Sequence, residues 1–130
     1  MQDSIFSKIV RGEIPSHKVY EDDKTLAFLD IHPIQPGHTL VIPKRQVEFL
    51  WDLTDEDYMA LMETSKLVAK QLRTVLKKPF IGVQVIGVDV PHAHIHLIPF
   101  SIVEEFRRRP DMDAIVNHQV LSELATMIAF

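Results

Sequence analysis

The sequence predicts an α+β fold with a mainly antiparallel sheet and one long helix. Short apolar runs separated by turn residues indicate strands that pair with their neighbours along the chain. The stretch from Thr54 to Lys77 carries apolar residues at three- and four-residue spacing, which is the helical period. Histidines alternate strictly with apolar residues between Val90 and Pro99, which indicates one further strand.

Composition limits both the size and the class of the protein. The 130 residues predict a single domain, residues 1–130, and 46% hydrophobic with 25% charged residues is ordinary for a water-soluble chain. A net charge of −4 argues against a general nucleic-acid binder. The absence of cysteine excludes a disulfide scaffold and a thiolate zinc site, and it suits a reducing compartment. With no secretory leader and no membrane-length apolar run, we expect a cytoplasmic protein without a membrane partner.

The first half of the chain predicts one short helix and three strands. Ser4 is a good N-cap and Gly12 a good stop for the helix. Strands are predicted at His17–Glu21, Thr25–Asp30 and His38–Pro43. The second of these is almost continuously apolar, so both of its faces should be covered.

The second half predicts the long helix, two strands and a closing helix. Thr54 caps an acidic first turn, and Pro79 follows the end of the long helix. Phe80–Gly87 is rich in β-branched residues and predicts a strand. A helical pattern from about Val116 to Ile128 closes the chain.

The alternating histidines give the segment before Pro99 its chemical interest. On a strand, His92, His94 and His96 share one face, each about 6.6–6.8 Å from the next. The opposite face is small and apolar and consists of Ala93, Ile95 and Leu97. We therefore expect an internal strand of the sheet, with Ala93 and Ile95 buried under the long helix.

A row of imidazoles has three interpretations. It could be a solvated strand face, or an open zinc site, because three histidines can hold zinc. Neighbouring side chains on one strand face converge poorly on a single ion, however, so no metal ligands are assigned. Nucleophilic or acid–base chemistry on a phosphate ester is favoured, because imidazole titrates near neutrality and can attack phosphorus or donate to its oxygens.

At these residues the sequence resembles the histidine triad (HIT) family, whose signature is three histidines alternating with apolar residues. The first half resembles the Hint branch of that family. The matching stretches are Ile5–Pro15, Glu21–Asp23, Leu26–Ile31, His38–Lys44 and His92–Ile98. The resemblance covers about residues 1–100, and it leaves residues 101–130 as a C-terminal extension with a helix.

The resemblance implies a five-stranded antiparallel sheet with one long helix, assembled as a homodimer. It also implies a hydrolase or transferase without a cofactor, which binds a purine nucleotide conjugate and cleaves it at the α-phosphate through a nucleotidyl-histidine. In that scheme His94 is the nucleophile, His92 and His96 bind and orient the phosphate, and His38 is the fourth active-site histidine. Asp30 is the ribose-binding acid. The base pocket is formed by Ile5, Phe6, Ile9, Phe28, Leu29 and Ile31.

The loop before the histidines departs from the family pattern. It is shorter than usual, and Gln84 is the candidate for the amide that the family places upstream. Asp89 replaces a hydroxyl donor, and a carboxylate there repels a phosphate unless it is protonated or turned away. The leaving group is therefore open between a phosphoramidate and a dinucleoside polyphosphate. Two other functions also remain open: a nucleotide-binding regulatory protein with negligible turnover, and a metal-dependent hydrolase.

Overall fold

The computed structural model describes residues 2–130 and shows one antiparallel sheet of five strands in the order β1-β2-β3-β5-β4. The strands are β1 (Lys18–Glu21), β2 (Thr25–Leu29), β3 (Thr39–Pro43), β4 (Phe80–Gln84) and β5 (Ile95–Phe100). This confirms the α+β class and the antiparallel sheet. The strand expected over Phe80–Gly87 ends earlier, at Gln84.

Four α-helices surround the sheet. They are α1 (Ile5–Val10), α2 (Asp55–Leu76), α3 (Val103–Phe106) and α4 (His118–Ile128), and a 3₁₀ turn, η1, covers Leu50–Asp52. The Thr54 hydroxyl caps α2 by accepting from the Asp57 amide at 3.2 Å, as its position before an acidic turn predicts. The closing helix begins at His118, two residues later than expected, and α3 was not expected.

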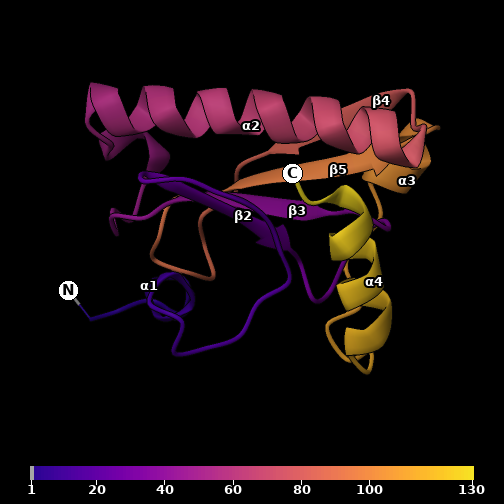
Figure 1. Ribbon diagram of the computed structural model, residues 1–130, viewed down its shortest axis with the longest axis horizontal. Coiled ribbons are helices and arrows are strands. Elements are labelled where there is room, and N and C mark those ends of the chain that lie inside the picture. Colours follow the sequence, from indigo (N-terminus) through magenta and orange to yellow (C-terminus); the bar gives the residue numbers. More distant parts are fainter. Residues whose placement is uncertain (1) are drawn as a thin grey trace.

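The long helix α2 lies across one face of the sheet and α1 lies on the other side (Figure 1). On the α2 side, Ala93, Ile95 and Leu97 pack with Leu61 and Val68 in one buried cluster. On the α1 side, the second cluster is Phe6, Ile9, Leu26, Phe28, Leu40 and Ile42. Every residue of β2 is buried, so both of its faces are covered as expected.

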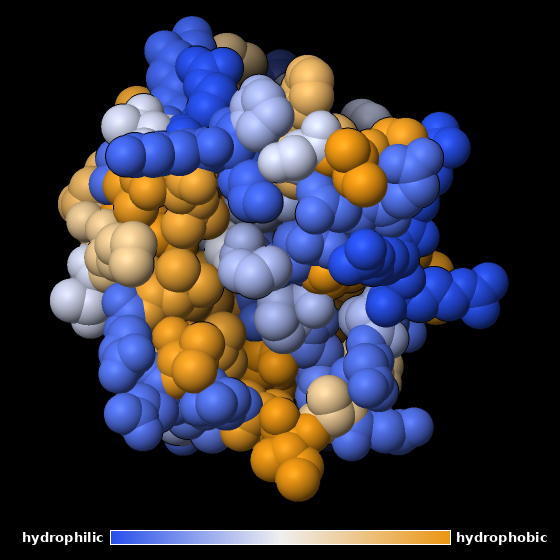
Figure 2. All heavy atoms as spheres, turned by 90° about the vertical axis from the view of Figure 1, so that its right-hand side faces the viewer, coloured by the Kyte–Doolittle hydropathy of each residue, from blue (hydrophilic) through white to orange (hydrophobic). Residues whose placement is uncertain are grey.

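The C-terminal segment closes the β1 side of the molecule. Leu121, Ala125 and Ile128 of α4 belong to the same core as α2. The last amide, that of Phe130, donates to the Val19 carbonyl at 3.1 Å and so extends the pairing beyond β1. The end of the molecule that carries α3 and α4 shows apolar surface beside hydrophilic surface (Figure 2). Among residues 2–130, no helix is long and apolar enough to cross a membrane.

The histidine strand is internal, as expected, because β5 pairs with β3 on one side and β4 on the other. It begins only at Ile95, however, so His92 and His94 precede it, and the expected row of three imidazoles on one strand face is not formed. The register pairs Val41 with Ile95, so Ile42 and His94 come next, and Pro43 and Ala93 would form the next hydrogen-bonded pair. Proline has no amide to donate, and the Ala93 amide instead donates to the Val47 carbonyl at 2.7 Å. The ladder therefore stops before the first two histidines.

Candidate functional site

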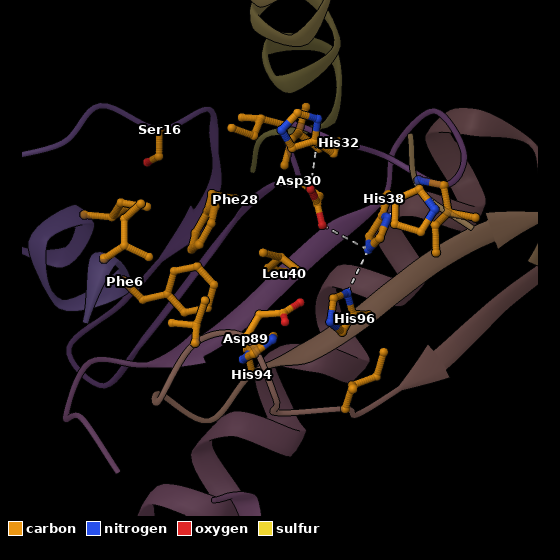
Figure 3. A pocket seen from close by; sticks show the side chains of 18 of the residues that line it. Phe6, Ser16, Phe28, Asp30, His32, His38, Leu40, Asp89, His94 and His96 are labelled. Carbon is orange, nitrogen blue, oxygen red and sulfur yellow. Dashed lines mark hydrogen bonds and ion pairs between the residues drawn. The ribbon is translucent and has the colours of Figure 1, made fainter. Parts of the chain in front are cut away.

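A cavity of about 390 Å³ opens on the α1 side of the sheet. Its walls come from α1 and the segment after it, the end of β2, the start of β3, the β4–β5 loop and β5 (Figure 3). This size falls within the range of small-molecule sites. Three of the four candidate histidines, His38, His94 and His96, line it, and the fourth, His92, does not.

The orientation of His94 is fixed by the residue two positions before it. Its Nδ1 lies 2.7 Å from the His92 carbonyl oxygen, and a carbonyl can only accept a hydrogen bond, so Nδ1 donates. In the neutral ring, Nε2 then carries the free lone pair. The ring is buried and packs edge-on against Phe6, with centroids 5.1 Å apart. The geometry thus gives His94 the tautomer that a nucleophile needs.

His38 and His96 form a pair of neutral imidazoles. The Ile34 amide donates to His38 Nδ1 at 3.0 Å, so the His38 hydrogen sits on Nε2. That Nε2–H lies 2.9 Å from His96 Nδ1, which therefore accepts, and the remaining ring donor of His96 is its Nε2–H. Burial lowers the pKa of His38 to about 3 and that of His96 to about 4. Neighbouring imidazoles, His96 for the first and His94 for the second, add to the lowering.

His92 is fully buried, and both of its ring nitrogens are bonded within the protein. Nε2 donates to the Pro43 carbonyl at 2.7 Å, and Nδ1 accepts from the Ser4 hydroxyl at 2.9 Å. Burial lowers its pKa. The ring therefore cannot contact a phosphate in the cavity, which corrects that part of its expected role. It holds in place the carbonyl that orients His94.

Asp30 lies at the cavity wall just after β2, next to the pair of His38 and His96. Its Oδ1 accepts from the His32 amide at 2.8 Å, and its Oδ2 is 3.5 Å from His38 Nε2. Burial raises its pKa, partly against the bond from His32. The carboxylate therefore keeps acceptor capacity that faces the cavity (Figure 3).

The apolar end of the cavity contains all six residues expected to form the base pocket: Ile5, Phe6, Ile9, Phe28, Leu29 and Ile31. The rings of Phe6 and Phe28 meet edge to face, with centroids 5.5 Å apart. Such an apolar, aromatic-walled slot suits a flat ring system.

Comparison with known proteins now supplies the family. The HIT domain model matches residues 11–101.

The chain belongs to the HIT family.

Among the relatives of this HIT chain, Protein hit of Bacillus subtilis is 40% identical over 105 residues, which cover 75% of this chain and 71% of the other. The adenosine 5′-monophosphoramidase HNT1 of Saccharomyces cerevisiae is 39% identical over 99 residues, which cover 73% of this chain and 61% of the yeast protein. A crystal structure of a HIT-like protein involved in cell-cycle regulation from Bartonella henselae superposes with a TM-score of 0.82. It is 34% identical, and the match covers 97% of this chain and 94% of that one.

The charge pattern of the cavity in this HIT chain is unusual for a site that would hold phosphates. Gln84 lies opposite His96 in the sheet and lines the cavity, and Asp89 also lines it from the loop ahead of β5. The ionisable side chains of the wall are Asp30, Asp89 and the imidazoles of His32, His38, His94 and His96. Among the described residues, no lysine or arginine lines the cavity.

Sequence reasoning missed several residues of the site. Ser16 and His32 line the cavity beside residues that the family pattern did mark. Pro110 and Met112 reach it from the segment between α3 and α4, far along the chain from the matching stretches. Gln46 accepts from the Ser4 amide at 2.9 Å and donates to the Pro91 carbonyl at 3.2 Å, and so ties α1 to the histidine segment. Gln46 follows Lys44 and Arg45 after β3, and no sequence pattern marked it for this role.

One group of residues could hold a cation. One ligand atom each from Asp30, His38 and His96 lie within 4.8 Å of one another. Two of the imidazole nitrogens already share a hydrogen bond, which a metal would have to replace. His94, whose Nε2 lone pair is free, stands outside this group.

Proposed function

We propose that this HIT protein is a nucleotide hydrolase or nucleotidyl transferase that cleaves a purine nucleotide conjugate at its α-phosphate. The observation that carries the proposal is the tautomer of His94, whose protonated Nδ1 leaves a lone pair on Nε2 in a cavity where His96 offers a donor. A nucleophile beside a preorganised donor is the arrangement that phosphoryl transfer requires.

The polar groups follow the order of the parts of a nucleotide. The α-phosphate lies against His94 and His96, the ribose hydroxyls bond the Asp30 carboxylate, and the base lies in the apolar end of the cavity, against Phe6 and Phe28. The His94 Nε2 attacks phosphorus, the bond to the leaving group breaks, and the leaving group takes up a proton. Water then attacks the phosphorus of the nucleotidyl-imidazole, which releases the nucleoside monophosphate and restores His94.

The charge of the cavity favours a phosphoramidate over a dinucleoside polyphosphate. A polyphosphate brings several negative charges, and within residues 2–130 the wall offers two carboxylates and no lysine or arginine to meet them. His38 and His96 are neutral at pH 7, because their pKa values are about 3 and about 4. A nucleoside phosphoramidate carries a single negative charge at phosphorus. The yeast relative HNT1 is an adenosine 5′-monophosphoramidase, which acts on a substrate of this class.

The test is turnover of adenosine phosphoramidates and diadenosine polyphosphates by the wild type and by His94→Ala. We expect the phosphoramidates to be hydrolysed faster and the variant to lose nearly all activity. Nucleotide binding without turnover of either class would instead favour a regulatory nucleotide-binding protein.

A metal-dependent hydrolase is the second candidate, favoured by the convergence of Asp30, His38 and His96. Metal analysis of the purified protein separates it from the first. Stoichiometric zinc, with activity that a chelator removes, would replace the covalent mechanism.

We also propose a homodimer built on β4 and part of α2. Strand β4 is one of the two edge strands of the sheet, and among the described residues no strand pairs with its outer edge. Its Phe80 and Val83 side chains are 54% and 59% exposed. Light scattering at micromolar concentration should give the dimer mass, and Val83→Lys should reduce it by half. A monomeric wild type would contradict this assembly.

A cytoplasmic location is a further prediction. Fractionation of cells that express the tagged chain would test it.

A further inference from the structure

Ser16 carries a hydroxyl that has no partner in the structure. Its Oγ is buried and forms no hydrogen bond, although the residue lines the cavity. Serine 16 lies between α1 and β1, in the segment that passes over the apolar end of the cavity. Buried polar groups in folded proteins are nearly always paired, so a hydroxyl at a cavity wall that no protein group bonds is available to a ligand.

Ser16 lines the cavity together with the apolar side chains of Ile5, Ile9, Ile14, Phe6 and Phe28. Figure 3 shows Ser16 beyond Phe28, on the far side from His94 and His96, while Asp30 lies beside His38. The Ser16 side chain is only partly buried and has three staggered positions, so the hydroxyl can turn toward a ligand in the slot.

We propose that Ser16 reads the polar edge of the purine base and is a specificity-determining residue of this site. The inference rests on the proposed function, which puts the phosphate at His94, the ribose at Asp30 and the base at the end where Ser16 lies. A hydroxyl both donates and accepts. It therefore pairs with the 6-amino group of adenine or the 6-oxo group of guanine, and it leaves an unsubstituted purine ring without that bond.

The experiment compares two ligands that differ only in this group. Calorimetry measures the affinity of the full-length wild type for adenosine monophosphate and for purine riboside 5′-monophosphate, which lacks the 6-amino group. We expect the wild type to prefer adenosine monophosphate by about three- to tenfold, the range of one net hydrogen bond. In Ser16→Ala the preference should fall below about twofold, while the affinity for the unsubstituted ligand stays the same.

Three further readings separate base recognition from a structural role. Ser16→Thr keeps a hydroxyl and should keep the preference, and Ser122→Ala, an exposed serine of α4, should change nothing. Ser16→Ala should not lower the free energy of unfolding, because its hydroxyl has no partner to lose. An unchanged preference in Ser16→Ala, an equal loss for both ligands, or a loss of stability would each overturn the inference and leave the proposed function standing. A wild type that binds neither nucleotide would overturn the proposed function itself.

Discussion

Acidification should destabilise this protein because its two neutral imidazoles, His38 and His96, are buried against each other. The folded pKa values of about 3 and about 4 lie below the unfolded value of 6.5. The folded state therefore binds fewer protons than the unfolded chain. The stability that this difference contributes is fully present above pH 6.5, and it is lost as the pH falls from there toward the folded pKa values.

The size of the effect follows from proton linkage. Between about pH 7.5 and about pH 5.5 each imidazole should remove about 1.3 kcal/mol from the free energy of unfolding, or about 2.7 kcal/mol for the pair. Carboxyl groups with ordinary pKa values near 4 stay ionised across this window. Burial raises the pKa of Asp30, beside His38, so any proton that Asp30 takes up in the window acts in the opposite direction. Burial also lowers the pKa of His17 and His92, so these rings act in the same direction.

Urea unfolding followed by far-UV circular dichroism at several pH values measures this fall. In His38→Asn, an amide oxygen can still accept from the Ile34 amide, and one titrating group of the pair is gone. We expect that variant to be less stable at every pH but to lose about 1.3 kcal/mol of the pH dependence. A wild type whose stability falls by less than about 1 kcal/mol across the window, or a variant with the full dependence, would refute the assignment of a neutral pair.

Three other predictions concern the site. His94→Ala should lose nearly all turnover yet still bind adenosine monophosphate. Rapid quench of the wild type should trap a nucleotidyl group on His94. A variant that keeps more than about a tenth of the wild-type rate would rule out His94 as the nucleophile. Asp30→Ala should weaken nucleotide binding at least about tenfold, and the 2′,3′-dideoxy analogue much less, as calorimetry would show; equal losses would reduce Asp30 to a turn former. Asp89→Asn should raise kcat/KM for a diadenosine polyphosphate about two- to fivefold and leave kcat/KM for the phosphoramidate nearly unchanged. Asp23→Asn, on the β1–β2 turn outside the cavity, should alter neither value. No gain for the polyphosphate in Asp89→Asn would show that Asp89 does not repel it.

The sheet and the long helix could be predicted because their signals are local. Apolar periodicity and end signals are properties of a few neighbouring residues, as the Thr54 cap and the continuous apolar run of β2 show. The start of β5 could not be predicted in this way. It depends on Pro43, a residue of another strand, whose missing amide ends the ladder across from the histidines.

The sequence could predict which residues form the site, but it could not predict the hydrogen-bond partners that orient them. His38, His94 and His96 do share one cavity with Asp30. Which nitrogen of each ring bears the hydrogen depends on the carbonyl of His92 and the amide of Ile34, and backbone groups leave no trace in a sequence. Met112 lines the cavity from the loop between α3 and α4, and the path of that loop depends on how α4 packs on the core. No pattern in the neighbouring sequence therefore predicts its place in the site.

The proline at the end of β3 has a consequence for any attempt to stabilise this protein. Along β3 the Lys44 amide points to β2, where it donates to the Lys24 carbonyl at 2.8 Å, so an amide at position 43 would point the other way, toward Ala93. We expect a substitution such as Pro43→Val to let β3 and β5 pair further and to raise the free energy of unfolding. The same extra pairing would bring Ala93 into the sheet and move the His92 carbonyl away from the His94 ring. Stability and the orientation of His94 are thus set against each other at one residue that does not line the cavity.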